Sequence, residues 1–197
     1  MCGRFFVDDE TWNEIEKIAK KIDRESAKKG DVHPSEPALV LQRSGEEIIS
    51  EVAKWGYEAA GKSDVLFNAR SETVDKRPMF RYDYETRRCV IPVGKFYEWK
   101  QMPDKQKEQY EFFIPENVLF LAGIYHRTPE GERFTVLTRE AEGCMKGIHH
   151  RMPVILRPED IEVWLFSREE ADCLLNVYME ELQRRCVFPA YQQMSIF

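Results

Sequence analysis

Several features that define other protein classes are missing from this chain. No stretch reaches the roughly 18 uninterrupted apolar residues that a membrane helix needs, and residues 1–9 lack the apolar run of a secretory signal. These absences favour a cytoplasmic protein. The sequence also lacks internal repeats and low-complexity tracts. Its 197 residues, of which 43% are hydrophobic and 32% are charged, are therefore expected to form one globular domain spanning 1–197.

A disulfide framework and a metal motif are missing as well. The five cysteines are odd in number, and none belongs to a C-x-x-C pair. They are Cys2, Cys89, Cys144, Cys173 and Cys186. The last four are interpreted as small buried hydrophobic residues. The adjacent His149 and His150 have no H-x-x-x-H pattern around them, so neither a metal site nor a cofactor is expected.

A net positive charge is also absent. The formal charge of −6 argues against a general nucleic-acid binder. However, residues 61–110 carry 11 basic and 8 acidic side chains, whereas residues 158–197 carry 3 and 8. Because phosphate binding depends on a local patch, a basic face remains compatible with the acidic total.

Hydrophobic patterning predicts an α+β fold, with a central antiparallel, barrel-like β-sheet and peripheral helices. A helix is expected to begin at Asp8, continue through Ile22 and end at 28–30. A short helix is expected from 158–160, and a capping box predicts another over Arg168–Arg184. The expected strands are Ala38–Gln42, Ile48–Trp55, Val65–Ala69, Arg88–Pro92, Tyr97–Lys100, Glu111–Ile114, Val118–Ile124, Phe134–Thr138 and Val154–Leu156.

Cys2 directly follows Met1. Removal of Met1 would leave Cys2 with an α-amine, whose pKa is about 7.7–8.0, beside a thiol. The neutral amine can form a Schiff base with an aldehyde, and the thiol can then close onto the imine carbon as a thiazolidine. A lysine cannot perform that second step. Taken alone, Met-Cys favours an incidental small residue at position 2.

Three later segments place reactive side chains beside apolar strands. Asn68 and Arg70 offer an amide and a phosphate-binding fork, although the segment taken alone favours a strand end with a turn-forming Asn and a surface Arg–Glu pair. Glu98 lies between two aromatic residues and is either an enclosed proton carrier or a solvated residue on a half-exposed strand. His149 lies near Arg151, just before an apolar strand, and can act as an acid at neutral pH.

Four segments occur in one order: M-C-G-R-F, N-A-R-x-E-T, R-C-x-I-P followed by F-Y-E-W, and I-H-x-R-M-P-V-I-L. Together they resemble the SOS-response-associated peptidase family, the abasic-site processing proteins. The resemblance implies an autopeptidase that removes Met1 and a thiazolidine crosslink from Cys2 to an abasic site in single-stranded DNA. That crosslink would protect the lesion during repair, and lyase-type activity stays compatible with it.

The resemblance also implies a role for each candidate residue. Asn68 would position the amine or the opened sugar, Glu98 would shuttle protons, and His149 would donate the proton that favours ring opening. Arg4, Arg70 and Arg151 would bind phosphates. Base stacking would come from Trp55 or a neighbouring apolar side chain. The expected protein is a bacterial, cytoplasmic monomer that is nucleoid-associated when it binds DNA.

Two other functions remain open at this stage. One is a conventional thiol peptidase that uses Cys2 and His149 on protein substrates. The other is a damage-sensing DNA-binding module. His33, Lys95 and His150 depart from the family's pattern and receive no role.

Overall fold

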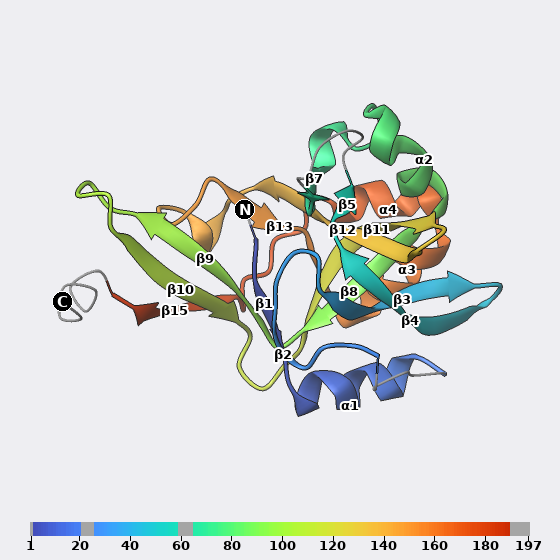
Figure 1. Cartoon of the computed structure of the whole chain (residues 1–197), viewed down its shortest axis with the longest axis horizontal. Coiled ribbons are helices and arrows are strands. Elements are labelled where there is room, and N and C mark those ends of the chain that lie inside the picture. Colours follow the sequence, from blue (N-terminus) through green and yellow to red (C-terminus); the bar gives the residue numbers. More distant parts are fainter. Residues whose placement is uncertain (1, 21–25, 59–64, 190–197) are drawn as a thin grey trace.

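The central element of the computed structural model, which describes residues 2–20, 26–58 and 65–189, is a closed five-stranded barrel (Figure 1). Its strands are β3 (Pro37–Ser44), β4 (Glu47–Trp55), β8 (Arg88–Val93), β11 (Leu119–Thr128) and β12 (Gly131–Glu140). Neighbouring strands run antiparallel except at the seam where β4 meets β12. The predicted α+β class with a barrel-like sheet is confirmed.

Short strands extend the barrel at its rim. β7 (Asn68–Arg70) continues the parallel seam along β12, directly after the place where β4 ends. β13 (Arg151–Pro153) pairs with β12, and β14 (Ile155–Leu156) pairs with β11. β5 (Tyr57–Glu58) and β6 (Val65–Leu66) form a separate two-stranded ribbon. The rim therefore brings β7 and the segment before β13 to the same end of β12.

Large apolar side chains are buried on both faces of the barrel sheet. Trp55, Phe134 and Ile91 lie on one face, and Leu41 and Phe120 on the other, and all are fully buried or nearly so. Burying a side chain of this size stabilises the fold by about 1.5–3 kcal/mol. β8 is buried along its whole length and β11 through Tyr125, so both faces of these strands are covered.

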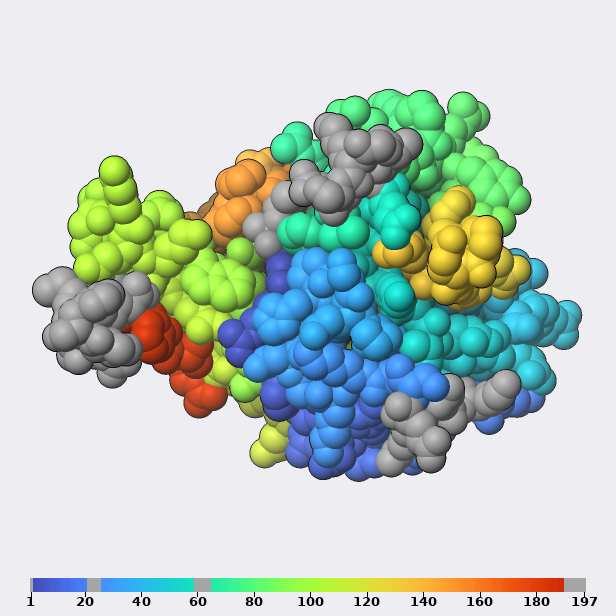
Figure 2. All heavy atoms as spheres, viewed as in Figure 1, coloured from blue at the N-terminus to red at the C-terminus, as the bar shows by residue number. Residues whose placement is uncertain are grey.

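A second, five-stranded sheet projects from the barrel as an arm, visible at the left of Figures 1 and 2. Its order is β15 (Gln183–Phe188), β10 (Lys107–Phe113), β9 (Lys95–Gln101), β1 (Phe5–Val7) and β2 (Gly30–Val32). The first strand of the chain therefore lies inside this sheet, between β2 and β9. Because β1 is held on both edges, the residues just before it have a fixed place.

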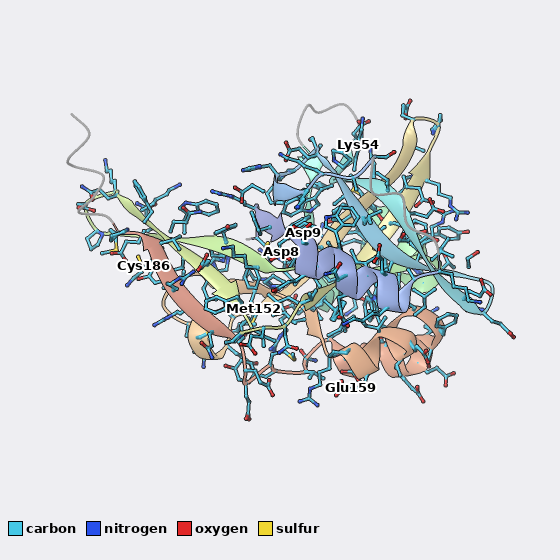
Figure 3. The ribbon with its side chains drawn as sticks, turned by 90° about the horizontal axis from the view of Figure 1, so that it is seen from below. Asp8, Asp9, Lys54, Met152, Glu159 and Cys186 are labelled. Atoms are coloured by element: carbon cyan, nitrogen blue, oxygen red, sulfur yellow. The ribbon has the colours of Figure 1, made fainter. Side chains whose placement is uncertain are left out.

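Gly94 joins the barrel to the arm, since it separates β8 from β9. Its N–H donates to the Phe6 carbonyl at 2.8 Å. A Cβ at this position would lie 2.6 Å from Asp8 Oδ2. The Asp8 carboxylate in turn caps α1 (Asp9–Ile18) by accepting from the Thr11 N–H at 2.8 Å. Figure 3 shows Asp8 at this helix start, which confirms the predicted cap.

Helices cover the outside of the barrel. α2 (Pro78–Thr86), α3 (Ile161–Phe166) and α4 (Arg168–Leu174) join α1, and short 3-10 turns occupy Ser71–Thr73, Gly143–Met145 and Pro158–Asp160. The short helix expected from 158–160 is confirmed by the last of these turns and α3. The sequence analysis missed α2, although Pro78 stands at its first turn, where proline is favoured.

Two predicted helices end earlier than expected. The first ends at Ile18, because Ala19 is already extended and the Lys20 N–H reaches the Ile48 carbonyl; Ile22 lies outside the described residues. The helix expected over Arg168–Arg184 ends at Leu174, because residues 183–188 pair with β10 instead. In both cases sheet contacts outweigh helical periodicity.

The four remaining cysteines do not share one environment. Cys89 is buried, as predicted, and Cys144 is half-buried. Cys173 and Cys186 are exposed, so the expectation of burial is wrong for them. Cys186 lies on the outer strand of the arm, labelled in Figure 3, where no further described strand covers it.

Candidate functional site

Cys2 lies completely buried where the arm meets the rim of the barrel. The pairing of β1 with β2 and β9 fixes its backbone, and its thiol lies 3.7 Å from the Arg4 carbonyl. Burial raises the pKa of the Cys2 thiol far above its ordinary value, and the negative charge of Glu98 raises it further. The resting sulfur is therefore a neutral thiol and not a thiolate.

Asn68 connects the barrel directly to Cys2. Its side-chain Nδ2 donates to the Cys2 carbonyl at 2.9 Å, from the first position of β7. The amide oxygen, Oδ1, is buried and has no hydrogen-bond partner among the described residues. A buried acceptor of this kind is costly unless a donor reaches it. The geometry thus offers an acceptor beside the backbone of Cys2.

Glu98 enters from the arm. It is 2% exposed on β9, and it lies opposite Tyr110 of β10. The sequence left its environment open between an enclosed and a solvated carboxylate, and the structure places it in the enclosed one. Oε1 of Glu98 lies 4.0 Å from Nδ1 of His149, and its charge acts on the thiol of Cys2.

His149 lies on the turn that precedes β13. Its Nδ1 is 3.0 Å from the Arg151 backbone N–H, which can only donate, so the neutral ring carries its proton on Nε2. The same Nδ1 is 3.2 Å from the Arg151 carbonyl, which can accept once the ring is protonated. Burial lowers the pKa of His149 below its ordinary value of 6.5, while Glu98 opposes that shift.

Arg4 and Arg151 already have carboxylate partners. Arg4 donates to Asp31 at 2.9 and 2.6 Å, and its guanidinium covers the Tyr97 ring at 4.4 Å. Arg151 is 8% exposed, donates to both oxygens of Glu72 at 2.6 and 2.8 Å, and reaches the carbonyl of Thr138. Both guanidinium groups therefore fix the site's backbone in this conformation, and a phosphate would have to compete for them.

Trp55 corrects one expectation. The residue is 0% exposed, and its indole N–H donates to the Phe67 carbonyl at 2.9 Å. Its ring packs against Phe5 and Phe67 at centroid distances of 4.7 and 5.8 Å. Base stacking by Trp55 is thus wrong, because no face of its ring is exposed. It instead supports the two segments that carry Cys2 and Asn68.

An open groove that the sequence analysis missed runs from Asn68 to α2. We name it the Arg70 groove; its volume is about 500 Å³, and it is lined by Leu66, Asn68, Ala69, Arg70, Thr73, Arg77, Pro78, Met79 and Phe80. Neither Arg70 nor Arg77 forms an ion pair with any residue that the structure describes. The exposed Leu66 and Met79 add apolar surface. A signal in the sequence that could have revealed the groove is Arg77, which directly precedes Pro78 at the start of a helix.

Other features of a site are not found in the part of the chain that is described. None of its helices is both long and apolar enough to cross a membrane. Within residues 2–20, 26–58 and 65–189, no group of three or more His, Cys, Asp or Glu side chains could hold a metal ion.

Comparison with known proteins gives concordant matches. Residues 1–191 match the family profile described as SOS response associated peptidase (SRAP). Abasic site processing protein YoqW of Bacillus subtilis is 34% identical over 182 residues, covering 84% of this chain and 80% of that protein. Abasic site processing protein YedK of Escherichia coli is 29% identical over 177 residues, covering 84% and 79%.

Two solved structures share the fold. A protein from Bacteroides thetaiotaomicron has a TM-score of 0.81 at 21% identity, covering 98% of this chain and 94% of that chain. A protein from Bordetella bronchiseptica has a TM-score of 0.80 at 21% identity, covering 95% and 100%.

Proposed function

Since this chain belongs to the SOS response associated peptidase family, we propose that it processes abasic sites in single-stranded DNA by crosslinking them to Cys2. The observation that carries the proposal is the hydrogen bond from Asn68 to the Cys2 carbonyl. This bond ties Cys2, which can present both an α-amine and a thiol, to the barrel rim, and Glu98 and His149 lie in the same group of side chains. Relatives named abasic site processing proteins support the same substrate.

The chemistry begins with the loss of Met1, a residue that lies outside the described part of the chain. The freed Cys2 amine attacks the aldehyde carbon of the ring-opened deoxyribose, and one water leaves as the C=N bond forms. The thiol sulfur then adds to the imine carbon, and its proton passes to the nitrogen. The product is a five-membered thiazolidine, which occupies the carbon that would otherwise promote strand cleavage.

The neighbouring side chains have complementary tasks. The buried Oδ1 of Asn68 accepts from the amine and orients its lone pair. Glu98, enclosed beside the thiol, takes and returns the protons that these steps release. His149, whose neutral ring presents Nε2–H, donates toward the sugar oxygen and opens the ring.

The state of the thiol distinguishes this function from a conventional thiol peptidase. Such a peptidase needs a thiolate beside an imidazolium, with the pKa of the thiol lowered. Burial and Glu98 instead raise the pKa of Cys2, and burial lowers that of His149. These shifts favour a mechanism in which the amine attacks first. The neutral thiol adds afterwards, as Glu98 takes its proton.

The DNA strand is proposed to lie along the Arg70 groove. Arg70 and Arg77 flank the groove without carboxylate partners among the described residues, so both can bind phosphate oxygens without breaking an ion pair. The exposed Leu66 and Met79 provide the apolar surface that the sequence analysis assigned to Trp55 or a neighbour. A single strand avoids the cost of extruding a nucleotide from a duplex.

The test combines intact mass with gel electrophoresis. The mature protein should lack one methionine, and incubation with single-stranded DNA carrying one abasic site should give a heat-stable, slower-migrating species. Cys2→Ala should abolish that species. Cys2→Ser, which keeps the amine, should form only a complex that heat dissociates unless borohydride reduces it. A stable species in either variant, or Met1 retained on active protein, would overturn the proposal.

A further inference from the structure

A second hollow adjoins the Arg70 groove at the start of α2. We name it the His126 cavity; its volume is about 440 Å³, and it is lined by Tyr57, Glu58, Pro78, Met79, His126, Thr128 and Arg133. Pro78 and Met79 line both hollows, so they form a shared wall. The groove also contains Asn68, which contacts Cys2. A continuous surface therefore leads from the crosslinking residue to His126.

The imidazole of His126 is held by a buried carboxylate. Asp83, which is 2% exposed, lies 3.0 Å from His126 Nδ1 through Oδ2. The same carboxylate accepts from the Tyr57 hydroxyl at 3.2 Å and from Arg87 at 2.9 Å. Each of these partners limits the rotation of Asp83, so the His126 ring is held in one orientation. Fixing a ring before binding lowers the entropy that binding must remove.

This anchoring leaves one ring nitrogen for a ligand. Nδ1 is committed to Asp83, and Nε2 has no hydrogen bond to any residue within the described ranges. The side chain of His126 is 48% exposed. Its ring lies against that of Tyr57, with centroids 5.6 Å apart. The cavity thus presents one hydrogen-bonding nitrogen on a half-exposed imidazole ring that the buried Tyr57 supports from behind.

The remaining walls favour a flat aromatic ring over a phosphate. Pro78 and the Met79 side chain are apolar, and a thioether packs favourably on aromatic rings. Arg133, the one arginine that lines this cavity, already forms an ion pair with Glu58 and donates to the Gly56 carbonyl at 3.2 Å. A phosphate would have to break that ion pair, whereas a base needs only stacking surface and the free nitrogen.

We propose that the His126 cavity binds the base of an intact nucleotide on one side of the abasic site, beyond the nucleotide that lies over the Arg70 groove. The inference rests on the proposed function, because it assumes that the strand passes from Cys2 along that groove. His126 and Met79 are binding residues here and take no part in forming the crosslink.

The experiment measures noncovalent binding separately from crosslinking. Single-stranded oligonucleotides carry a tetrahydrofuran residue, an abasic analogue without an aldehyde, and are lengthened one nucleotide at a time on the 5′ or the 3′ side. Fluorescence anisotropy should show one step on one side, at which affinity rises about tenfold, as expected for one stacked base. Replacing that base alone with a second tetrahydrofuran should remove the step.

His126→Ala and Met79→Ala should each remove most of the rise in affinity. Replacing the base with tetrahydrofuran should then change the affinity of these variants little further. The matched controls are Arg127→Ala, the next residue on β11, and Tyr82→Ala, an exposed residue of α2 that does not line the cavity. Both controls should keep the step. Both controls should also crosslink a true abasic site in the shortest oligonucleotide at the wild-type rate.

Three results would overturn the inference: no step on either side in the wild type, a step that survives base deletion, or a step that persists in both cavity variants. A wild-type protein that binds with the step but never crosslinks would instead refute the proposed function and leave base binding in place.

Discussion

Glu98 and Glu111 lie one register step apart on β9 and β10, and both are 2% exposed, yet they project from opposite faces of the arm. Glu98 stands opposite Tyr110, whereas Glu111 stands opposite Tyr97. Because side chains alternate along a strand, the two carboxylates point away from each other. Equal burial on the same two strands therefore gives two different environments.

The partners of the two carboxylates explain the difference. Glu111 accepts from Lys95 at 2.9 Å and from Arg185 at 2.6 Å, so two cations neutralise it. Oε1 of Glu98 lies 4.0 Å from Nδ1 of His149, and its charge acts on the thiol of Cys2. The two cations make Glu111 part of an ion-pair cluster that serves the fold, whereas Glu98, beside a thiol and an imidazole, is the carboxylate that we propose to pass protons. Position relative to Cys2, and not burial, separates the two roles.

The largest expected effect comes from Glu98→Gln. The amide keeps the shape of the side chain but cannot carry a proton, so crosslink formation should slow by at least about 100-fold. Single-turnover gel assays on abasic single-stranded DNA measure the rate, and anisotropy with a tetrahydrofuran oligonucleotide should show unchanged affinity. Glu111→Gln is the matched control and should crosslink normally. Equal rates for the two variants would remove Glu98 from the mechanism.

The variants Glu98→Gln and Glu111→Gln should rank in the opposite order when their stability is measured. Glu111→Gln removes the negative charge and one of the two oxygens that accept from Lys95 and Arg185, and losing a charged hydrogen bond in a buried site costs about 1–3 kcal/mol. Urea unfolding followed by tryptophan fluorescence should reveal that loss. Glu98→Gln should change the free energy of unfolding less. If Glu98→Gln is the more destabilising substitution, the assignment of structural and chemical roles is wrong.

A smaller effect is expected for DNA affinity. The comparison is between Arg185, which Glu111 neutralises, and Arg70, which forms no ion pair with any described residue. Arg70→Ala should weaken binding to single-stranded DNA several-fold and reduce the salt slope of binding by about 0.7. Arg185→Ala should leave both quantities nearly unchanged, because Glu111 already neutralises that guanidinium. Titrations at several salt concentrations provide the measurement, and matching slopes for the two variants would contradict the proposed path of the strand.

The smallest effect concerns the titration of His149. Burial lowers its pKa below 6.5, and the attraction of Glu98 for the imidazolium partly opposes this shift. Glu98→Gln removes the attraction, so the pKa of His149 should fall further, and the protonated form should appear only at lower pH. The ring proton signals in NMR spectra report this pKa. An unchanged or higher value would show that Glu98 does not act on His149, and Glu111→Gln should leave the titration unaffected.

The sequence predicted the reactive groups better than their partners. Cys2 was singled out because it follows Met1, Asn68 because it follows an apolar strand, and Glu98 because it interrupts an aromatic run, but only the family resemblance joined them into one site. Arg4 and Arg151 were expected to bind phosphate, but their carboxylate partners lie 27 and 79 residues away in the sequence. No local pattern reveals such pairs, since a guanidinium has the same sequence signature whether or not a carboxylate folds against it.

Trp55 and the last helix show the same limit in the fold. An indole suits both a stacking surface and a core, and only closure of the barrel decides that Trp55 lies inside. The apolar spacing after Ser167 fits a long helix, but the open edge of β10 recruits residues 183–188 as a strand. The sequence did not predict the Arg70 groove, because α2 forms one of its walls and only the fold places α2 beside β7.

Gly94 gives the molecule a point of low mutational tolerance where the barrel joins the arm. A single added methyl group would meet the carboxylate that caps α1, while the Gly94 N–H still holds β1 through Phe6. The displacement would pass along four residues to Cys2, and a shift of about 1 Å at a reacting centre can reduce a rate about 100-fold. Substitutions of Gly94 would therefore be selected against because they misalign the reacting atoms, although Gly94 itself has no side chain.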